Sequence, residues 1–319
     1  MEPEVRWPQT PHSSGGGGAR QIPQPSPVPS LADDVFAALL SLLETGRCGR
    51  RPVLALNGPV GAGKSTLVRT LAGRAADCGL RLAVASIDDL YLPLAERRQR
   101  LAGNPFGVSR VPPGSHDVAL LLERLSAWRN GGPLVLPCFD KRLADGEGDR
   151  CGEQRLEAEA LLLEGWLLGC QALGASRLDE ELQSCLARWP LEAEECRWLP
   201  RWDQELSAYQ PLWNACDGLW VLRPQRWSLP RRWRFQAEAR QRRGGGGSLA
   251  PTALDRLVRA SLHALPPPLY QDPLVSPGRA SRGAIPLLGF HVLDGRRRPI
   301  EASSEQDHSS LSSASSAIG

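Results

Sequence analysis

Short apolar runs alternate with segments of helical periodicity along this chain of 319 residues. Each run is five to seven residues long, which is typical of a buried strand. The runs predict strands at residues 52–57, 81–87, 133–139, 160–166, 218–223 and 288–292.

Helical periodicity fills the intervals between these runs. Over residues 31–43, apolar side chains recur at steps of three and four behind Ser30, a helix-capping residue. A second helix is predicted at about 63–78, and a third follows Ser115. Strands separated by helices form a mostly parallel sheet with helices on both faces. We therefore predict an α/β fold of three layers, with ligands bound beyond the carboxyl ends of the strands.

The two ends of the chain differ in composition from the rest. Residues 1–30 are rich in Pro, Gly and Ser, and residues 302–319 are rich in Ser with almost no large apolar side chains. Such segments bury too little apolar surface to fold, so we expect a disordered leader and a disordered tail. Residues 31–301 are predicted to form a single domain, with a flexible loop at 244–248 around the Gly244–Gly247 run.

A glycine-rich loop joins the first predicted strand to the helix that follows it. The sequence GPVGAGKS, Gly58 to Ser65, fits the phosphate-binding pattern G-x-x-x-x-G-K-[ST] of P-loop NTPases. Lys64 would reach the β- and γ-phosphates, and the Ser65 hydroxyl would bind Mg²⁺. We therefore predict a catalytic Lys64 and nucleotide contacts from Gly58, Gly61, Ala62, Gly63, Lys64, Ser65 and Thr66.

The chain contains only two lysines, Lys64 and Lys141, among 38 basic residues. Guanine recognition in GTPases uses an N-K-x-D segment, but Gly63 and Asp140 precede these lysines, so no such segment exists. ATP is therefore the favoured nucleotide. All other Lys or Arg positions carry arginine. A position that carries lysine is therefore a candidate for a role that needs a compact ammonium group.

Carboxylates follow two of the predicted strands. Asp88 and Asp89 end the strand at 81–87, where a carboxylate can take the proton of an acceptor hydroxyl or hold Mg²⁺. We favour Asp88 as the base and Asp89 as its neighbour; the alternative is a turn or helix-capping role. Glu164 follows another apolar run and is a candidate for the Walker B acid that binds Mg²⁺, with a solvated turn as the alternative.

Residues 223–243 carry eight arginines interleaved with aromatic side chains. We favour a helical lid that closes over the triphosphate, with Arg234 and Arg240 as catalytic residues that neutralise the transferred group. A solvated basic helix and a nucleic-acid-binding surface are the alternatives.

The remaining composition excludes several classes of protein. No run approaches the ~18 apolar residues of a membrane span, and no secretory signal is recognisable. The eight cysteines include no C-x-x-C pair, which favours free thiols in a reducing cytoplasm. A net charge of +3 does not by itself indicate nucleic acid. We therefore expect a cytoplasmic protein without membrane or nucleic-acid partners.

Several motifs, in order, resemble the D-glycerate 3-kinase family. The phosphate loop and SIDDLYL are shared with the wider group of uridine kinase, phosphoribulokinase and pantothenate kinase. The more specific segments are PGSHD (113–117), FDKRLADGEGDR (139–150) and EGWLLG (164–169). The resemblance runs from about residue 50 to 243 and is weaker near LLGFHVLDGRRRPI (287–300).

The resemblance implies a P-loop kinase with ATP and Mg²⁺ as cofactors, in which Asp88 is the base or Mg²⁺-linked acid and Glu164 the Walker B-like acid. The PGSHD and FDK segments would border the acceptor site. The candidate groups for binding a substrate carboxylate are Lys141 and Arg150, followed by Arg110, His116 and Tyr91. For His116 the alternative role is helix capping together with Asp117, and for Arg150 it is pairing with Asp149 or Asp140.

These expectations define an ATP-dependent kinase that phosphorylates a small hydroxy acid, with D-glycerate giving 3-phosphoglycerate as the favoured reaction. The alternatives are another kinase of the same group acting on a nucleoside, pantothenate or a sugar phosphate, an RNA-stimulated P-loop ATPase, and a P-loop scaffold without turnover. Oligomeric state is left open by the sequence.

Overall fold

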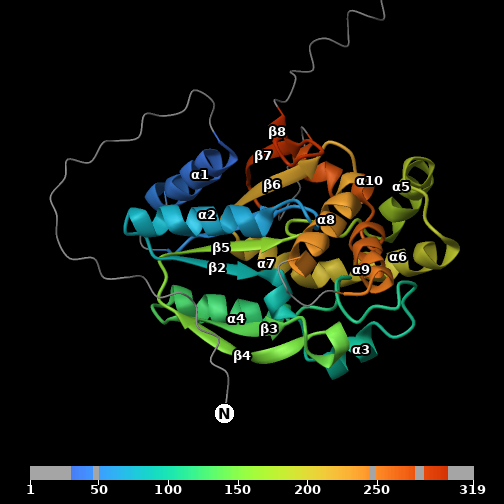
Figure 1. Ribbon diagram of the computed structural model, residues 1–319, viewed down its shortest axis with the longest axis horizontal. Coiled ribbons are helices and arrows are strands. Elements are labelled where there is room, and N and C mark those ends of the chain that lie inside the picture. Colours follow the sequence, from blue (N-terminus) through green and yellow to red (C-terminus); the bar gives the residue numbers. More distant parts are fainter. Residues whose placement is uncertain (1–29, 46–49, 244–248, 277–283, 301–319) are drawn as a thin grey trace, which may run out of the picture. The chain divides into compact units, whose positions relative to one another are not determined.

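A six-stranded sheet with the order β2-β5-β1-β6-β7-β8 forms the centre of the computed structural model (Figure 1). All neighbouring strands are parallel except β8, which runs antiparallel to β7. The structure describes residues 30–45, 50–243, 249–276 and 284–300. The bounds of the strands are β1 Val53–Asn57, β2 Leu82–Ser86, β5 Ala160–Gly165, β6 Gly218–Pro224, β7 Leu287–Leu293 and β8 Pro299–Ile300.

Three expectations concern residues outside this description. The leader at 1–30, apart from Ser30, the tail at 302–319 and the loop at 244–248 all lie outside the described residues.

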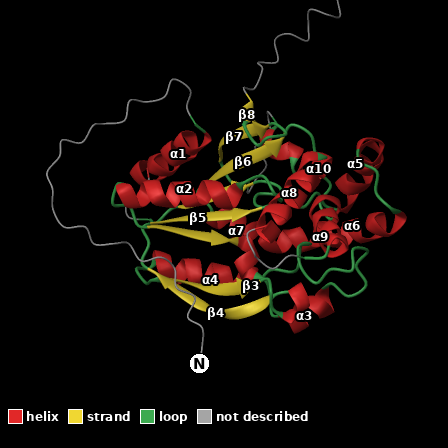
Figure 2. Cartoon of the chain, in the orientation of Figure 1, coloured by secondary structure: helices red, strands yellow, loops and turns green. Residues whose placement is uncertain are grey.

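Helices cover both faces of the sheet and form the outer layers (Figure 2). On one side lie α1 (Leu31–Thr45) and α2 (Lys64–Asp77), and on the other lies α4 (Val118–Arg129) (Figure 1). Alternate residues of β1 point to opposite cores: Leu54 packs in the cluster of α1 and α2, and Val53 packs in the cluster of α4. This confirms the predicted α/β fold of three layers.

Further helices gather beyond the carboxyl ends of the strands (Figure 1). Most of these helices pack apolar side chains onto the core of the α4 side, and one packs Leu229 and Trp233 onto the core of the α1 and α2 side. Their bounds are α3 Leu94–Arg100, α5 Ala175–Arg188, α6 Ala193–Leu206, α7 Gln210–Ala215, α8 Leu229–Arg243, α9 Pro251–His263 and α10 Pro267–Tyr270. None of the described helices is both long and apolar enough to cross a membrane.

The apolar run at 133–139 was expected in the parallel sheet, and this prediction is wrong. The strand forms as β3 (Leu134–Asp140), but it pairs antiparallel with β4 (Asp149–Leu156) in a separate two-stranded sheet. The connection of eight residues is too short for a parallel crossover and suits a hairpin. β4 was not predicted because its half-exposed sequence, DRCGEQRL, lacks an apolar run. The FDK segment therefore ends β3 and enters the hairpin turn.

A buried leucine of the central strand is a test of this core. Leu54 in β1 is 0% exposed. We expect Leu54→Ala to lower the free energy of unfolding by about 2–5 kcal/mol, because it removes buried methyl groups and leaves a cavity. Urea unfolding followed by circular dichroism measures the change. Leu40→Ala on α1, where the side chain is 37% exposed, is the control and should stay within about 0.5 kcal/mol. Equal losses in both variants would contradict the assignment of the core.

Candidate active site

The phosphate loop lies between β1 and α2. Gly61 and Gly63 have φ values of 77° and 97°, in the left-handed region that side-chain-bearing residues rarely adopt. Gly63 is the N-cap of α2 and supplies no side chain to cap it, so the first amides of the helix face the loop, in the arrangement that binds a phosphate group. The Lys64 ammonium donates to the carbonyl of Gly58 at 2.7 Å and lies 3.6 Å from Glu164 Oε2. The loop thus has the geometry that its sequence predicted.

Three parallel strands bring the predicted carboxylates beside this loop. Glu164 of β5 stands in register with Leu56 of β1 on one side and with Ser86 of β2 on the other. The short 3₁₀ helix η2 (Ile87–Leu90) begins directly after β2 and carries Asp88 and Asp89. A Cβ on Gly165 would lie 2.7 Å from the Ile87 side chain, so glycine at this strand end permits the close approach of η2.

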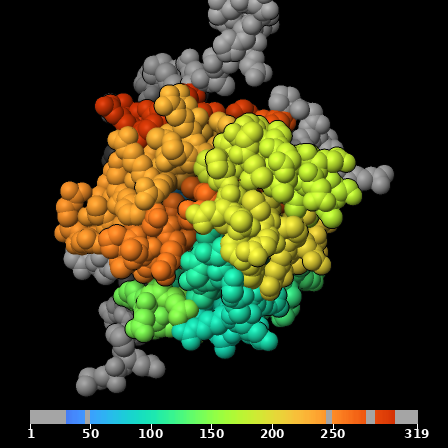
Figure 3. Space-filling view, turned by 90° about the vertical axis from the view of Figure 1, so that its right-hand side faces the viewer, coloured from blue at the N-terminus to red at the C-terminus, as the bar shows by residue number. Residues whose placement is uncertain are grey.

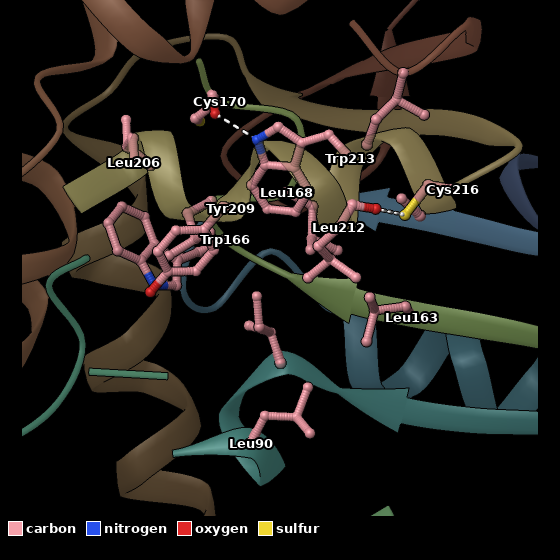
Figure 4. Packing of buried hydrophobic residues seen from close by; sticks show 14 of the residues in the cluster. Leu90, Leu163, Trp166, Leu168, Cys170, Leu206, Tyr209, Leu212, Trp213 and Cys216 are labelled. Carbon is pink, nitrogen blue, oxygen red and sulfur yellow. Dashed lines mark hydrogen bonds between the residues drawn. The ribbon is translucent and has the colours of Figure 1, made fainter. Parts of the chain in front are cut away.

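The segment after Glu164 is held in place by buried aromatic residues (Figure 4). The Trp213 indole donates to the carbonyl of Cys170 at 2.8 Å, and the Asn57 amide donates to the carbonyl of Leu168 at 2.7 Å. Both bonds join residues far apart in the sequence. The Asn57 bond joins the carboxyl end of β1 to the segment after β5, and the Trp213 bond joins that segment to α7.

Asp88 is bound on both oxygens. Its Oδ1 accepts a hydrogen bond from the Tyr91 hydroxyl at 2.9 Å, and its Oδ2 lies 2.6 Å from the Lys141 ammonium. Burial opposes ionisation of Asp88, but the attraction and hydrogen bond of Lys141, together with the hydrogen bond of Tyr91 and the nearby His116, outweigh it and hold the pKa of Asp88 well below its usual range. The same pair raises the pKa of Lys141. The two predicted groups form one ion pair on the cavity wall.

Asp89 has a different environment. Its carboxylate accepts a hydrogen bond from the backbone N–H of Ser86 at 3.1 Å and completes a capping box with that residue. Burial, together with the neighbouring Asp88 and Glu164, raises the pKa of Asp89 to about 6. Asp89 does not line the cavity, whereas Asp88 does. Asp89 therefore has the capping role that was the alternative for this pair.

Aromatic packing supports the acceptor side. The rings of Tyr91 and His116 stack with centroids 4.6 Å apart, and His116 Nδ1 lies 2.7 Å from the Tyr209 hydroxyl. Burial lowers the pKa of His116 to about 4, so the ring is neutral at physiological pH. Asp117 caps α4 through the N–H of Leu120. His116 therefore packs behind Tyr91 and does not reach the cavity.

The predicted arginines of this region bind mainly backbone and structural partners. The Arg150 guanidinium pairs with Asp117 at 2.8 Å and donates to the carbonyl of Tyr91, and Arg150 does not line the cavity. Its side-chain ion-pair partner therefore differs from Asp149 and Asp140, the two partners that the sequence suggested. Arg110 lines the cavity while donating to the carbonyl of Gly146 at 2.7 Å.

Sequence reasoning missed Arg97, which holds this region together. The Arg97 side chain is fully buried and donates to the carbonyls of Leu92 at 2.7 Å, Ser109 at 2.9 Å and Gly148. Its guanidinium also lies over the ring of Phe139. Arg97 thereby ties α3 to the turn that carries Lys141. Arg97 stands among other charged and polar residues (ERRQR, 96–100), a pattern typical of an exposed helix, so the sequence gave no indication of this role.

A cavity of about 400 Å³ joins the phosphate loop, the Asp88–Lys141 pair and α8. It lies beyond the carboxyl ends of the parallel strands. Figure 3 shows the molecule from this side, with the orange α8–α9 segment on the left and the yellow-green α5 segment on the right. Lys64, Glu164 and Tyr91 contribute to its wall. Predicted residues that line it also include Gly61, Ala62, Gly63, Ser65, Thr66, Asp88, Arg110, Lys141, Arg234 and Arg240, whereas Gly58, His116 and Arg150 do not.

The arginine-rich segment contributes to the cavity through α8. Arg234 and Arg240 line it, and Arg234 also pairs with the buried Glu238 at 2.8 Å. The Trp233 side chain is 0% exposed, so it is unavailable for stacking on a nucleic-acid base. A Cβ on Gly61 would lie 2.7 Å from the backbone nitrogen of Arg234, which shows how closely α8 packs on the phosphate loop. This packing favours the nucleotide-site interpretation of α8.

The oxygen groups on the cavity wall fit a magnesium ion. Ser65, Asp88 and Glu164 all line the same cavity as the phosphate loop. Mg²⁺ prefers oxygen ligands and is commonly held by one or two carboxylates together with substrate phosphates and water. Among the described residues, no group of three or more His, Cys, Asp and Glu side chains forms a metal cluster. A site shared with nucleotide phosphates is the arrangement that these residues fit.

Comparison with known proteins gives the family. No protein-family model matches the chain. An uncharacterized kinase of Schizosaccharomyces pombe, mug58, is 31% identical over 201 residues, which are 60% of this chain and 71% of the relative. The chloroplastic D-glycerate 3-kinase of Arabidopsis thaliana is 28% identical over 266 residues, which are 78% of this chain and 54% of the relative. The chain belongs to the D-glycerate 3-kinase family of P-loop kinases.

Solved structures agree with this fold. The D-glycerate 3-kinase of Cryptococcus neoformans superimposes with a TM-score of 0.72 at 24% identity and covers 85% of this chain and 98% of its own. The chain spans about half the length of the Arabidopsis relative. Family membership makes this protein a kinase that transfers a phosphoryl group and binds nucleotide through its P-loop.

The raised pKa of Asp89 predicts a dependence of stability on pH. The pKa of this carboxyl rises from 3.8 to about 6 on folding, so the folded chain holds the proton more tightly. Stability from this group is therefore present at low pH, declines between about pH 4 and 6, and is constant above that range. We expect Asp89→Asn, which cannot ionise but can still accept from Ser86, to melt a few degrees above the wild type at pH 8.

Thermal unfolding measured at several pH values between 4 and 8 tests this expectation. The advantage of Asp89→Asn should grow up to about pH 6 and then level off. A constant difference at every pH, or a loss at pH 8, would show that Asp89 is not held with a raised pKa.

Proposed function

We propose that this protein is an ATP- and Mg²⁺-dependent D-glycerate 3-kinase. The reaction transfers the γ-phosphoryl group of ATP to a hydroxyl of D-glycerate and gives 3-phosphoglycerate and ADP. The observation that carries the proposal is the shared cavity in which the phosphate loop faces the Asp88–Lys141 pair. The Arabidopsis relative named as a D-glycerate 3-kinase supports the choice of acceptor.

The donor side consists of the phosphate loop and the acid of β5. The amides at the start of α2 and the Lys64 ammonium bind the phosphates, for which Lys64 exchanges its contact with the Gly58 carbonyl. Ser65 and Glu164 would hold Mg²⁺, which screens the phosphate charge when bound. Arg234 and Arg240 supply further positive charge to the oxygens of the transferred group.

On the acceptor side, the proposed base is Asp88, and its ion pair with Lys141 lowers its basicity. A carboxylate whose pKa lies well below the usual range is a weak base, and Lys141 keeps Asp88 in that condition. Glycerate carries its own carboxylate, which competes for the Lys141 ammonium. When Lys141 turns to the substrate, burial remains and raises the pKa of Asp88, so the group becomes a better acceptor for the hydroxyl proton. Substrate binding thus activates the base.

The small size and polarity of the acceptor suit the wall around Lys141. Arg110 and Lys141 supply positive charge, and the Tyr91 hydroxyl is held by Asp88. Such a wall offers charged and hydrogen-bonding groups to a short anionic molecule with hydroxyl groups.

Acceptor choice and the role of Asp88 are tested together. We expect ADP release with D-glycerate and no release above background with uridine, pantothenate or ribulose 5-phosphate. Asp88→Asn should lower kcat by ~10²–10⁴-fold, because it removes the base, while the affinity for ATP is retained. A coupled assay for ADP measures turnover, and calorimetry measures nucleotide affinity.

Asp179→Asn on the exposed face of α5 is the matched control and should leave kcat unchanged. Turnover of uridine or pantothenate without glycerate would overturn the proposed acceptor. Full activity of Asp88→Asn would overturn the proposed base.

Lys141 is tested through the pH dependence of the reaction. We expect Lys141→Met to move the acid limb of the kcat/KM profile to higher pH, because burial without the ammonium raises the pKa of Asp88. In the wild type, Asp88 stays ionised down to the acid range. Lys141→Arg keeps the positive charge and should leave the acid limb in place, but raise the KM for glycerate because the planar group fits the site less well.

Arg142→Met is the control from the same turn, since Arg142 is 80% exposed and pairs with Asp140. An unchanged acid limb and unchanged glycerate KM in Lys141→Met would remove Lys141 from the acceptor site.

A further inference from the structure

The loop between β7 and β8 carries three consecutive arginines in different environments. Asp294 holds the loop by accepting the backbone N–H groups of Arg296 at 2.7 Å and Arg298 at 2.8 Å. The side chains of Arg296 and Arg298 point to solvent, whereas Arg297 is partly buried and lines the nucleotide cavity. One of the three arginines is therefore directed to the site.

Arg297 joins two elements that are far apart in the sequence. Its Nε donates to the carbonyl of Gly61 in the phosphate loop at 2.7 Å, and its Nη2 donates to the carbonyl of Trp233 in α8 at 2.9 Å. Its Cδ would lie 3.8 Å from a Cβ on Gly63, so the stem of the side chain crosses the phosphate loop. The guanidinium also lies over the Trp233 ring. The side chain bridges the phosphate loop and α8.

The backbone of Arg297 is in an unfavourable conformation for a residue with a side chain. Its φ is 65°, in the left-handed region where a turn of this kind ordinarily uses glycine or asparagine. Gly295, two residues earlier, has no side chain but uses its carbonyl to accept from the Trp233 indole at 3.1 Å. Strain of this kind persists where the side chain has a function that the surrounding structure enforces.

We propose that Arg297 is a positioning residue that holds α8 against the phosphate loop and so sets the width of the nucleotide cavity. This inference rests on the proposed function in that the cavity binds ATP. The two carbonyls that Arg297 bridges belong to the loop that binds the phosphates and to the helix that carries Arg234 and Arg240. Nucleotide contacts from both elements therefore depend on one side chain.

The charge of Arg297 adds to this coupling. Burial and the nearby Arg240 guanidinium lower the pKa of Arg297. Among the described residues, the Arg297 side chain donates to carbonyl and amide oxygens rather than to a carboxylate, so its positive charge adds to that of Arg240 at the cavity. Their mutual repulsion is relieved when a polyanion lies between them. ATP binding and the docking of α8 thus stabilise each other.

The test compares Arg297→Gly with the wild type. Glycine accepts the positive φ without strain, so the variant should fold and melt within a few degrees of the wild type. Removal of two hydrogen bonds from a charged donor should raise the Kd for ADP and the KM for ATP about tenfold or more, with the KM for glycerate unchanged. Calorimetry with ADP and Mg²⁺ and initial-rate kinetics measure these quantities. Arg297→Lys keeps the charge but cannot bridge both carbonyls, so it should show a smaller change in the same direction.

Arg296→Ala and Arg298→Ala, on the same loop, are the controls and should bind ADP as the wild type does. Wild-type affinity in Arg297→Gly, or equal weakening in all three variants, would overturn the inference. If the wild type binds ADP but uses no glycerate, the proposed acceptor fails while the calorimetric test of Arg297 remains decisive. Failure of the wild type to bind ADP would overturn both.

Discussion

The site depends on β5 lying between β1 and β2 in parallel register. This arrangement sets Glu164 beside Leu56 on one strand and Ser86 on the other, so a carboxylate and the ends of both neighbouring strands meet at one edge of the sheet. The phosphate loop leaves β1 there, and the helix with Asp88 leaves β2 there. Because parallel strands end on the same side, three segments separated in sequence supply one site. Hydrogen bonds from Asn57 and Trp213 attach the segment after β5 to β1 and α7.

Burial and charge oppose each other at Asp88, and their balance determines what the group can do. Burial alone would raise its pKa, whereas Lys141, with smaller effects of Tyr91 and His116, lowers it more in sum. The pKa of Asp88, the proposed base, is therefore controlled mainly by its contact with the Lys141 ammonium. Lys141 lies in the hairpin turn between β3 and β4, which the buried guanidinium of Arg97 attaches to α3. Lys141 thus comes from a hairpin outside the main sheet, and the hydrogen bonds of Arg97 to backbone carbonyls hold the turn of this hairpin in place.

The nucleotide side has a comparable construction. Here too an arginine binds carbonyls from separate elements: the partly buried Arg297 joins the phosphate loop to α8. A guanidinium has donors in a fixed planar arrangement, so it can bridge carbonyls that a lysine ammonium would contact only singly. The chain's preference for arginine suits these structural roles. Its two lysines, Lys64 and Lys141, both line the cavity, where each ammonium group lies beside a carboxylate, Glu164 or Asp88.

Much of the secondary structure and the phosphate loop of this protein could be predicted from local patterns in its sequence. Apolar runs of strand length, helical periodicity and glycines at left-handed positions of the phosphate loop are short-range constraints, and they predicted the parallel strands, the loop and the neighbourhood of Asp88 and Glu164. Tertiary structure alone decided what depends on distant contacts. The residues at 133–139 formed a strand as predicted, but only packing determined that it pairs in a hairpin. Arg150 pairs with Asp117, and Arg297 donates a hydrogen bond to Gly61, which lies 236 residues away in the sequence. The reason is physical: a local pattern records which face of a segment is buried, whereas the partner of a polar side chain is chosen by the fold that brings the two together.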